Sequence, residues 1–232
     1  MSRQSIYIQS QAAEAGGNGR LSFFLLLPLS VLLMGGLMGL VLVNPANTPE
    51  AVSHISSESL PGFASPGVIS PVFTAEVQAW AADILRWAGA AGLDPNMAAT
   101  VMQIESCGDP QALSRSGAMG LFQVMPFHFA DGEDGFDTET NARRGMDYLS
   151  RSLDTAGGDP RLAFAGYNGG IGVIGWLETD WPAETTRYAY WGSGIYAEAS
   201  SGALQSSRLD EWLQAGGASL CRQAADRLGL SR

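Results

Sequence analysis

Apolar residues recur at steps of three and four along much of the chain after residue 73, the period of amphipathic helices. Three such stripes consist of Val77, Trp80, Ile84 and Trp87, of Met97, Val101 and Ile104, and of Ala142, Met146, Leu149 and Leu153. Alternating apolar and polar positions, which are typical of strands, are almost absent. The pattern therefore predicts a mainly α domain.

The limits of two helices are marked by capping residues. Asp94 precedes Pro95, a combination of N-cap and first helical residue that opens a helix. The apolar stripe of that helix ends beside Glu105, and Gly108 is a suitable stop. A second Asp-Pro pair opens the helix that we expect over residues 159–167. The acidic stretch 131–137 is expected to be a loop.

The segment from Leu21 to Val43 carries no charge and consists of apolar or small residues throughout. At about 1.5 Å per residue, a helix of this length crosses a hydrocarbon layer of about 30 Å. Arg3 and Arg20 precede the segment, so the positive-inside rule places the N-terminus in the cytoplasm and the rest outside. A cleaved signal peptide is the alternative, but no small-x-small cleavage site follows.

These features divide the chain into five parts. Residues 1–20 are expected to form a cytoplasmic N-terminus and residues 21–43 a transmembrane helix. Residues 44–72 are rich in Pro, Ser, Gly and Ala and are expected to form a disordered linker. Residues 73–199 form the main domain. Residues 200–232 are predicted to add two short amphipathic helices, separated at Gly216-Gly217, that pack on the domain because neither is long enough to be stable alone.

The net charge of −10 argues against nucleic acid as a partner, since phosphate binding requires clustered Lys and Arg. It also gives no long-range attraction to anionic polymers, and its simplest role is to keep the domain soluble. His54 and His128 have no companion ligands, and the acidic loop lacks the spacing of a calcium loop, so we expect no metal and no cofactor.

Five short motifs carry the candidate chemistry. They are Ile104-Glu105-Ser106, residues 109–114 (DPQALS), 117–126 (GAMGLFQVMP), 165–170 (AGYNGG) and 184–188 (ETTRY). In order and spacing they resemble the soluble lytic transglycosylase family, the lysozyme-like enzymes that cleave peptidoglycan. The resemblance covers residues 73–199. It implies a lysozyme-like α+β domain, mainly α with minimal β-structure.

Glu105 is the candidate catalytic residue. It stands at the negative end of a helix dipole among apolar neighbours, and both effects raise the pKa of a carboxyl group, as a general acid requires. The alternative is an ordinary solvated Glu in a last helical turn. Glycosidases normally use two carboxylates, but the only other candidates we identify lie in the acidic loop, at positions the family does not use.

The resemblance implies that one Glu acts first as acid and then as base. It protonates the glycosidic oxygen and then takes a proton from the C6 hydroxyl of the same N-acetylmuramic acid, which gives a 1,6-anhydro product without consuming water. A lysozyme-type hydrolase is the nearest rival, and its product is one water heavier. A glycan-binding module without catalysis is a rival from another class.

Five further residues are expected to bind the glycan, by their match to the family motifs: Ser114, Gln123, Tyr167, Asn168 and Tyr188. Their alternative roles are local ones, such as a Gln that bonds to the backbone of a tight turn. Ser106 is interpreted as a local helix cap.

The chain departs from the family at three motif positions. Phe122 replaces the commoner Met, which is expected to change the shape of the cleft. Gly166 and Gly169 replace the commoner Ala and weaken helix propensity by up to about 1 kcal/mol each.

Cys107 and Cys221 are the only cysteines, and both lie outside the membrane in the predicted topology. We expect a disulfide between them that holds the tail beside the cleft. The alternative is two unpaired small apolar residues. The sequence as a whole predicts a murein lytic transglycosylase in the cell membrane, with one membrane-spanning helix and its catalytic domain outside. Its partners would be peptidoglycan strands and cell-wall or secretion machinery.

Overall fold

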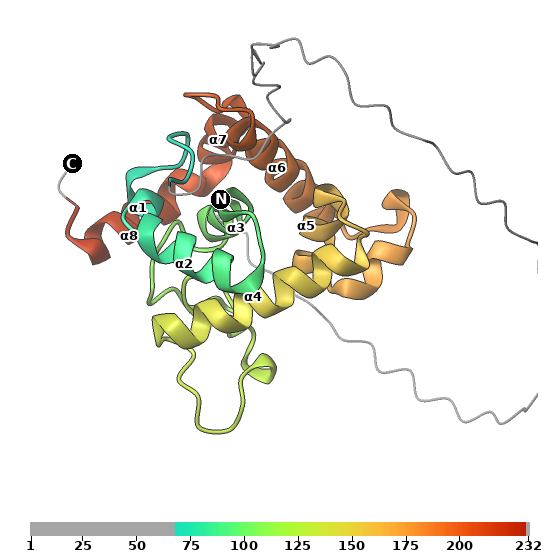
Figure 1. Ribbon diagram of the computed structural model, residues 1–232, viewed down its shortest axis with the longest axis horizontal. Helices are drawn as coiled ribbons and strands as arrows, with labels where there is room; N and C mark the ends of the chain where they lie inside the picture. The colour runs from blue at the N-terminus through green and yellow to red at the C-terminus, as the bar shows by residue number, and fades with distance from the viewer. Residues whose placement is uncertain (1–67, 231–232) are drawn as a thin grey trace, which may run out of the picture. The chain divides into compact units, whose positions relative to one another are not determined.

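The computed structural model describes residues 68–230, and these are predominantly helical (Figure 1). The elements are α1 (Ala75–Gln78), α2 (Ala81–Ala91), α3 (Pro95–Glu105), η1 (Pro126–His128), α4 (Thr138–Thr155), α5 (Pro160–Gly169), η2 (Ile171–Gly175), η3 (Glu178–Asp180), α6 (Ala183–Ser200), α7 (Ser207–Trp212), the π-helical turn η4 (Leu213–Gly217) and α8 (Ala218–Leu228). No helix in this range is both long and apolar enough to cross a membrane. The predicted spanning segment 21–43 lies outside the described residues.

The mainly α prediction is confirmed, and the β-structure is smaller than the resemblance implied. Within residues 68–230 there is no strand, only two isolated antiparallel bridges that pair Met119 with Leu113 and with Val124. These bridges fold the segment between α3 and η1 into tight turns. The small β-structure that the resemblance implies is thus limited to these backbone hydrogen bonds.

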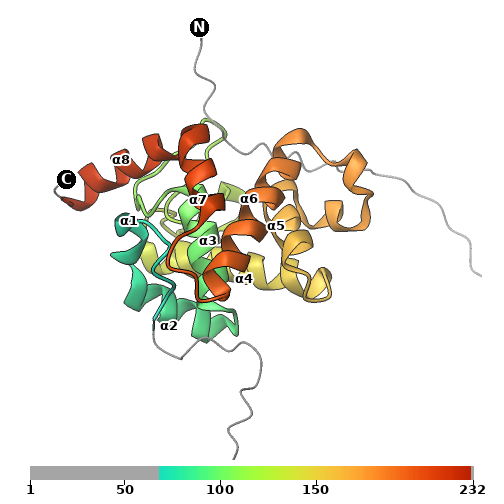
Figure 2. The ribbon, with the colours of Figure 1, turned by 90° about the horizontal axis from the view of Figure 1, so that it is seen from above.

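Helix α3 is the central element of the domain. It lies between α2 and α6 in both views (Figures 1 and 2), and every residue from Asn96 to Glu105 is buried. The predicted start is confirmed, because the Asp94 carboxylate accepts a hydrogen bond from the Asn96 amide at 2.8 Å and Pro95 is the first helical residue. The core around α3 therefore fixes the position of its last residue, Glu105.

The first apolar stripe is divided between two helices. Trp80 adopts a non-helical conformation between α1 and α2, and its indole nitrogen donates a hydrogen bond of 2.9 Å to the Gly108 carbonyl. The stripe nevertheless faces the core as predicted, since Val77, Ile84 and Trp87 are all buried. Spacing alone indicates the apolar face but not the break within it.

Helix α5 packs against both α4 and α6, and its two glycines allow the close approach of its neighbours. A Cβ atom on Gly166 would lie 2.6 Å from the Ile174 side chain and still closer to Ser152. A Cβ atom on Gly169 would lie 2.7 Å from the Thr185 hydroxyl. The loss of helix propensity at these positions is therefore accompanied by a packing requirement for glycine.

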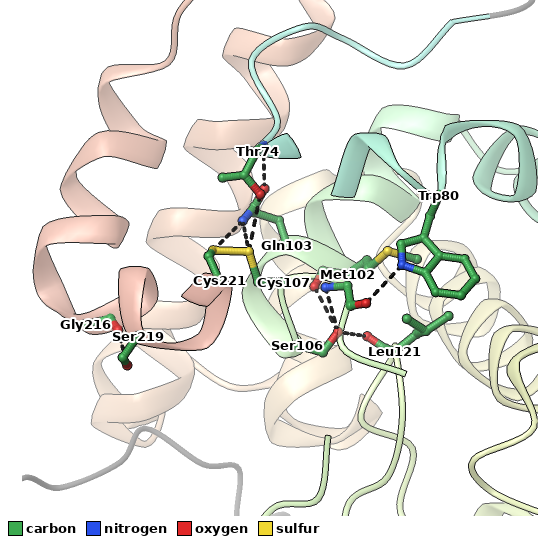
Figure 3. The surroundings of a disulfide bond; sticks show 11 residues. Thr74, Trp80, Met102, Gln103, Ser106, Cys107, Leu121, Gly216, Ser219 and Cys221 are labelled. Carbon is green, nitrogen blue, oxygen red and sulfur yellow. Dashed lines mark hydrogen bonds between the residues drawn. A yellow bond between two sulfur atoms is a disulfide. The ribbon is translucent and has the colours of Figure 1, made fainter. Parts of the chain in front are cut away.

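The tail packs on the domain as predicted. Leu209 and Trp212 of α7 and Ala224 of α8 are buried, and Gly216 breaks the run with a left-handed conformation. The predicted disulfide is present between Cys107 and Cys221, whose Cα atoms lie 5.0 Å apart (Figure 3). It connects the residue two positions after Glu105 to α8.

The predicted linker ends too late in the sequence. Ile69 and Val72 are only 1% and 8% exposed, and the Ser70 amide donates a hydrogen bond of 2.8 Å to the Asn96 side chain. Residues 69–72 thus belong to the folded domain. Ser70 and Pro71 lie between the two apolar anchors and concealed them in the sequence. The rest of the predicted linker, residues 44–67, lies outside the described residues.

Candidate active site

Glu105 is held in place by the residue that follows it. The Ser106 hydroxyl donates a hydrogen bond of 2.7 Å to the Leu121 carbonyl and accepts one of 3.1 Å from the Gly108 amide (Figure 3). Cys107 then adopts a left-handed backbone conformation with φ 51°. Ser106 is therefore more than the predicted helix cap, because it joins the end of α3 to the turn segment 117–126.

The carboxyl group of Glu105 has the character of a general acid. Its side chain is 5% exposed, and Oε1 has no hydrogen-bond partner among residues 68–230. Burial raises its pKa from 4.5 to about 8, although the nearby Tyr188 hydroxyl counteracts part of this effect. The Tyr188 oxygen does not reach regular hydrogen-bond geometry with any described group. Glu105 therefore retains its proton at neutral pH.

Glu184 supplies a second carboxyl group near Glu105, contrary to the expectation that only the acidic loop offers one. It lies in the first turn of α6, and its negative charge helps to raise the pKa of Glu105. Partial burial also raises the pKa of Glu184 itself, and its Oε1 has no hydrogen-bond partner within the described range. The motif containing it was recognised in the sequence, but its separation of 79 positions from Glu105 (184 − 105) concealed their proximity.

Gln123 closes a tight turn and also has a side-chain atom available to bind the glycan, the two roles expected from the sequence. Its side-chain nitrogen donates hydrogen bonds to the carbonyl groups of Ala112 and Gly120 at 3.1 and 3.0 Å. Its side-chain oxygen is buried and has no partner in the described part of the chain. The residue also has a left-handed conformation with φ 46°. The turn thus fixes the amide group and leaves its carbonyl oxygen free to accept a hydrogen bond.

Tyr167 and Asn168 lie at the end of α5, and the side chain of each makes a hydrogen bond within the protein. The Tyr167 hydroxyl donates a hydrogen bond of 2.8 Å to the Phe122 carbonyl. Burial raises its pKa, and an ionised Glu105 would raise it further. The Asn168 side-chain oxygen accepts a hydrogen bond of 3.0 Å from Thr185, while its nitrogen has no partner among residues 68–230. Asn168 therefore retains a free donor, whereas Tyr167 orients the turn segment.

Two other motif residues serve structure more than ligand contact. The Ser114 hydroxyl accepts a hydrogen bond of 2.8 Å from the Ala118 amide and so closes the turn before the segment 117–126. Phe122, expected to change the cleft, is fully buried and packs edge-on against Trp87 with ring centroids 6.1 Å apart. It therefore belongs to the core.

Asn141 is a positioning residue that the sequence analysis missed. Its side chain is fully buried, accepts a hydrogen bond of 2.9 Å from the Phe122 amide and donates to the carbonyl groups of Met119 and Gly135 at 2.7 and 2.9 Å. A polar residue inside the apolar stripe of α4 was the only signal that could have indicated it. Asn141 satisfies three backbone groups of the turns around Gln123.

The described residues do not offer a convincing metal site. Their one close group of candidate ligands consists of Glu76, Cys107 and Cys221, but the two sulfur atoms are joined in the disulfide and provide no thiolate. In the acidic loop, Glu133 is paired with Arg143 and Arg144, and Asp137 caps α4. These carboxylates have structural partners.

The sequence family described as Transglycosylase SLT domain matches residues 83–184, which include Glu105, the next three motifs and the first residue of the fifth, Glu184. These residues are similar to SLT domains. The transglycosylase of Enterobacteria phage PRD1 is 36% identical to the chain over 98 residues, which are 41% of this chain and 35% of the phage protein. The chain thus spans about a third of the length of this curated relative.

Solved structures similar to this chain include lytic transglycosylases. An inactive mutant of lytic transglycosylase Slt from Pseudomonas aeruginosa has 26% identity and a TM-score of 0.45, over 53% of this chain and 24% of that one. The 70 kDa soluble lytic transglycosylase from Escherichia coli has 20% identity and a TM-score of 0.39, over 59% of this chain and 24% of that one. The chain spans about a quarter of each.

Proposed function

We propose that this protein is a peptidoglycan lytic transglycosylase that uses Glu105 as its catalytic residue. The observation that carries the proposal is a buried carboxyl group with a pKa of about 8 and an unpaired oxygen, placed in a region similar to SLT domains. A carboxyl group that remains protonated at neutral pH can donate a proton to a glycosidic oxygen. The substrate is the β-1,4 bond between N-acetylmuramic acid and N-acetylglucosamine.

The proposed reaction uses Glu105 twice. Its proton passes to the glycosidic oxygen while the bond to C1 of N-acetylmuramic acid breaks. The resulting carboxylate then accepts the proton of the C6 hydroxyl as O6 bonds to C1, which closes the 1,6-anhydro ring. The substrate's acetamido group can stabilise the positive charge at C1. Glu105 ends protonated, and no water is consumed.

Three buried polar groups without hydrogen-bond partners among the described residues, all within the motifs, support a role in holding the sugar. The Gln123 side-chain oxygen can accept a hydrogen bond, and the Asn168 side-chain nitrogen can donate one. The Tyr188 hydroxyl can interact with both the substrate and the Glu105 carboxyl group. Buried polar groups without partners cost stability, so a ligand that pairs with all three gains binding energy by satisfying them.

The position of Glu184 also favours a second candidate function, a lysozyme-type hydrolase. A second carboxyl group near the acid can activate water or stabilise the cation, as in two-carboxylate glycosidases. The two functions differ in their products. Mass analysis of muropeptides released from purified peptidoglycan would show 1,6-anhydro ends for the lyase and reducing ends, one water heavier, for the hydrolase.

The experiment that tests catalysis compares the full chain with its Glu105→Gln variant on purified peptidoglycan. Gln keeps the shape of the side chain but cannot transfer a proton, so release of muropeptides should fall to background while the circular dichroism spectrum is unchanged. Glu178→Gln is the matched control, because Glu178 is an exposed carboxylate paired with Arg161. Substantial activity in the Glu105 variant would refute the mechanism.

We further propose that residues 21–43 anchor the protein in the cell membrane, with the folded domain on the outer side. The uncharged apolar run and the preceding Arg3 and Arg20 support this topology. The full chain should fractionate with membranes, and a variant lacking residues 1–43 should not. A mature protein whose N-terminus begins after residue 43 would instead indicate a cleaved signal peptide.

A further inference from the structure

Helix α8 is held to the domain by small side chains and one covalent bond. It lies at the edge of the domain in both views (Figures 1 and 2), and its buried residues are Cys221, Ala224 and Ala225. Leu220 adds a partly buried contact. The methyl group of a buried alanine contributes far less hydrophobic stabilisation than a fully buried Leu or Phe side chain. Because a helix as short as α8 is also unstable alone in water, its docking depends on the Cys107–Cys221 disulfide.

The neighbouring helix α7 has stronger apolar anchors and is joined to α8 through two glycines. Leu209 and Trp212 of α7 are only 3% and 2% exposed, so α7 is held on the core by its own side chains. Gly216 has φ 134°, a conformation that is accessible to glycine and rarely to other residues. Gly216 and Gly217 thus form a hinge about which α8 can leave the domain while α7 remains in place.

Two polar contacts between α8 and the rest of the domain are weak. Arg227 lies 3.4 Å from the Asp109 carboxylate, and its side chain is 53% exposed, so this ion pair contributes little to stability. The side-chain nitrogen of Gln103 donates hydrogen bonds to the sulfur atoms of Cys107 and Cys221 at 3.0 and 3.5 Å (Figure 3). Sulfur is a weak acceptor. Neither contact replaces the covalent bond.

The same disulfide constrains the turn that follows Glu105. Cys107 has φ 51°, a left-handed conformation that residues other than glycine seldom adopt. Such a conformation persists where the surrounding structure imposes it, and the bond to Cys221 is part of that structure. When the bond opens, the turn can relax and water gains access to the buried carboxyl group of Glu105.

We propose that the Cys107–Cys221 disulfide is a redox switch, whose reduction releases α8 about the glycine hinge and lowers the activity at Glu105. Oxidation of the two thiols restores both. The switch rests on the proposed function, because peptidoglycan cleavage is the activity that it controls. A chain whose thiols are still reduced is then a poor enzyme, and full activity follows oxidation, which is favoured outside the cytoplasm.

The switch operates by thiol–disulfide exchange. A thiolate of a dithiol reductant attacks the disulfide to form a mixed disulfide, which the second sulfur of the reductant then resolves. Two electrons and two protons pass to the protein, which gains two thiols, and the dithiol becomes a disulfide. Oxidised glutathione reverses the reaction: it reforms the protein disulfide and is itself reduced to two molecules of glutathione.

The test compares the full chain in detergent before and after reduction with dithiothreitol, with complete reduction verified by titration of both thiols. On reduction, α8 should lose its protection from hydrogen exchange while α3 retains it. The kcat for muropeptide release should fall about 10- to 100-fold, as expected for a displaced catalytic group, and should recover with oxidised glutathione. The matched control is the double variant Cys107→Ser with Cys221→Ser, in which dithiothreitol should change neither quantity.

The alkaline limit of kcat/KM gives a further readout, which a loss of stability alone would not move. Burial raises the pKa of Glu105 to about 8, so access of water should lower this pKa and shift the limit to lower pH. The groups that act on Glu105 are Tyr188 and Glu184 of α6 and Tyr167 of α5. None of these lies on α8, so the shift would report hydration of the Glu105 carboxyl group.

Three results would overturn the proposal: an α8 that stays protected after complete reduction, an α3 that loses protection together with α8, and an unchanged kcat in the reduced protein. The second would mean that the disulfide supports the whole fold and is no separate switch. Failure of the proposed function is distinguishable, since it appears as an oxidised chain that does not cleave peptidoglycan. In that case hydrogen exchange still reports the release of α8, and an unchanged pKa of Glu105 in carbon NMR would overturn the coupling.

Discussion

The Ser106 hydroxyl and the Leu121 carbonyl are joined by a hydrogen bond of 2.7 Å, which connects the residue after Glu105 to the turn that contains Gln123. Ser106→Ala should leave the buried Leu121 carbonyl without this partner and destabilise the domain by about 1–3 kcal/mol. Because the bond positions Glu105 against the turn, kcat should also decrease. Urea denaturation and muropeptide release check the two effects. Ser219→Ala, which affects an exposed serine of α8, serves as the control.

The raised pKa of Glu105 predicts a pH-dependent stability. An unfolded Glu ionises near 4.5, whereas folded Glu105 holds its proton until about 8. Between these values the unfolded state binds fewer protons, so the free energy of unfolding falls as pH rises, by up to about 1.4 kcal/mol per pH unit. Below about pH 4.5 Glu105 is protonated in both states, so it does not make stability depend on pH. Above about pH 8 it is ionised in both states, and its contribution to stability has been lost completely. Glu105→Gln should lack this decline, and parallel curves for the two proteins would contradict the assignment.

The same pKa should limit catalysis in alkaline solution, and two neighbours should shift that limit in opposite directions. Interaction with the Tyr188 hydroxyl lowers the pKa of Glu105, while the charge of Glu184 raises it. The kcat/KM of wild type should therefore fall above about pH 8. Tyr188→Phe should move this fall to higher pH and Glu184→Gln to lower pH. Shifts in the same direction would show that these residues act by another route.

Gln123 and Tyr167 should matter less than Glu105, since neither transfers a proton. Gln123→Ala removes a free acceptor and two turn-closing hydrogen bonds, and Tyr167→Phe removes the bond to the Phe122 carbonyl. We expect about 10- to 100-fold lower kcat/KM for each, the effect of roughly 1.4–3 kcal/mol. Losses as complete as that of Glu105→Gln, with an intact fold, would mean that this division of roles is wrong.

The disulfide should contribute strongly to stability, because Cys107 and Cys221 are 114 positions apart. A loop of this length constrains the unfolded chain by up to about 4–5 kcal/mol in the chain-entropy model. The double variant in which both residues are Ala should lose stability of this order in guanidinium denaturation. Reduction of the wild type should cause a similar loss. An unchanged midpoint in both experiments would contradict the expectation.

The parts of the structure that could be predicted from sequence are those that depend on local signals. Asp94 and Pro95 start α3, its apolar stripe runs to Glu105, and both features require only neighbouring residues. The proximity of Glu184 to Glu105 depends on the packing of α6 against α3. No local pattern encodes this packing.

The same limit explains the remaining differences. The sequence indicates for Ser106 only a local role as a helix cap. Its hydrogen-bond partner, the Leu121 carbonyl, comes from a turn whose path the sequence does not specify. Asn141 satisfies backbone groups of that same turn, so its role also required the folded chain. The linker boundary was misplaced because Ile69 is an isolated apolar residue, and its burial depends on a surface formed by distant helices.

The disulfide has a practical consequence for anyone who isolates or transplants this domain. The family match ends at Glu184, within the first turn of α6, yet Cys107 is bonded to Cys221 of α8. A fragment cut at the family limits would have an odd thiol beside Glu105 and would expose the side of α3 that α6 covers. A transferable fragment therefore has to extend at least from Ile69, which is buried in the domain, to Cys221 of α8.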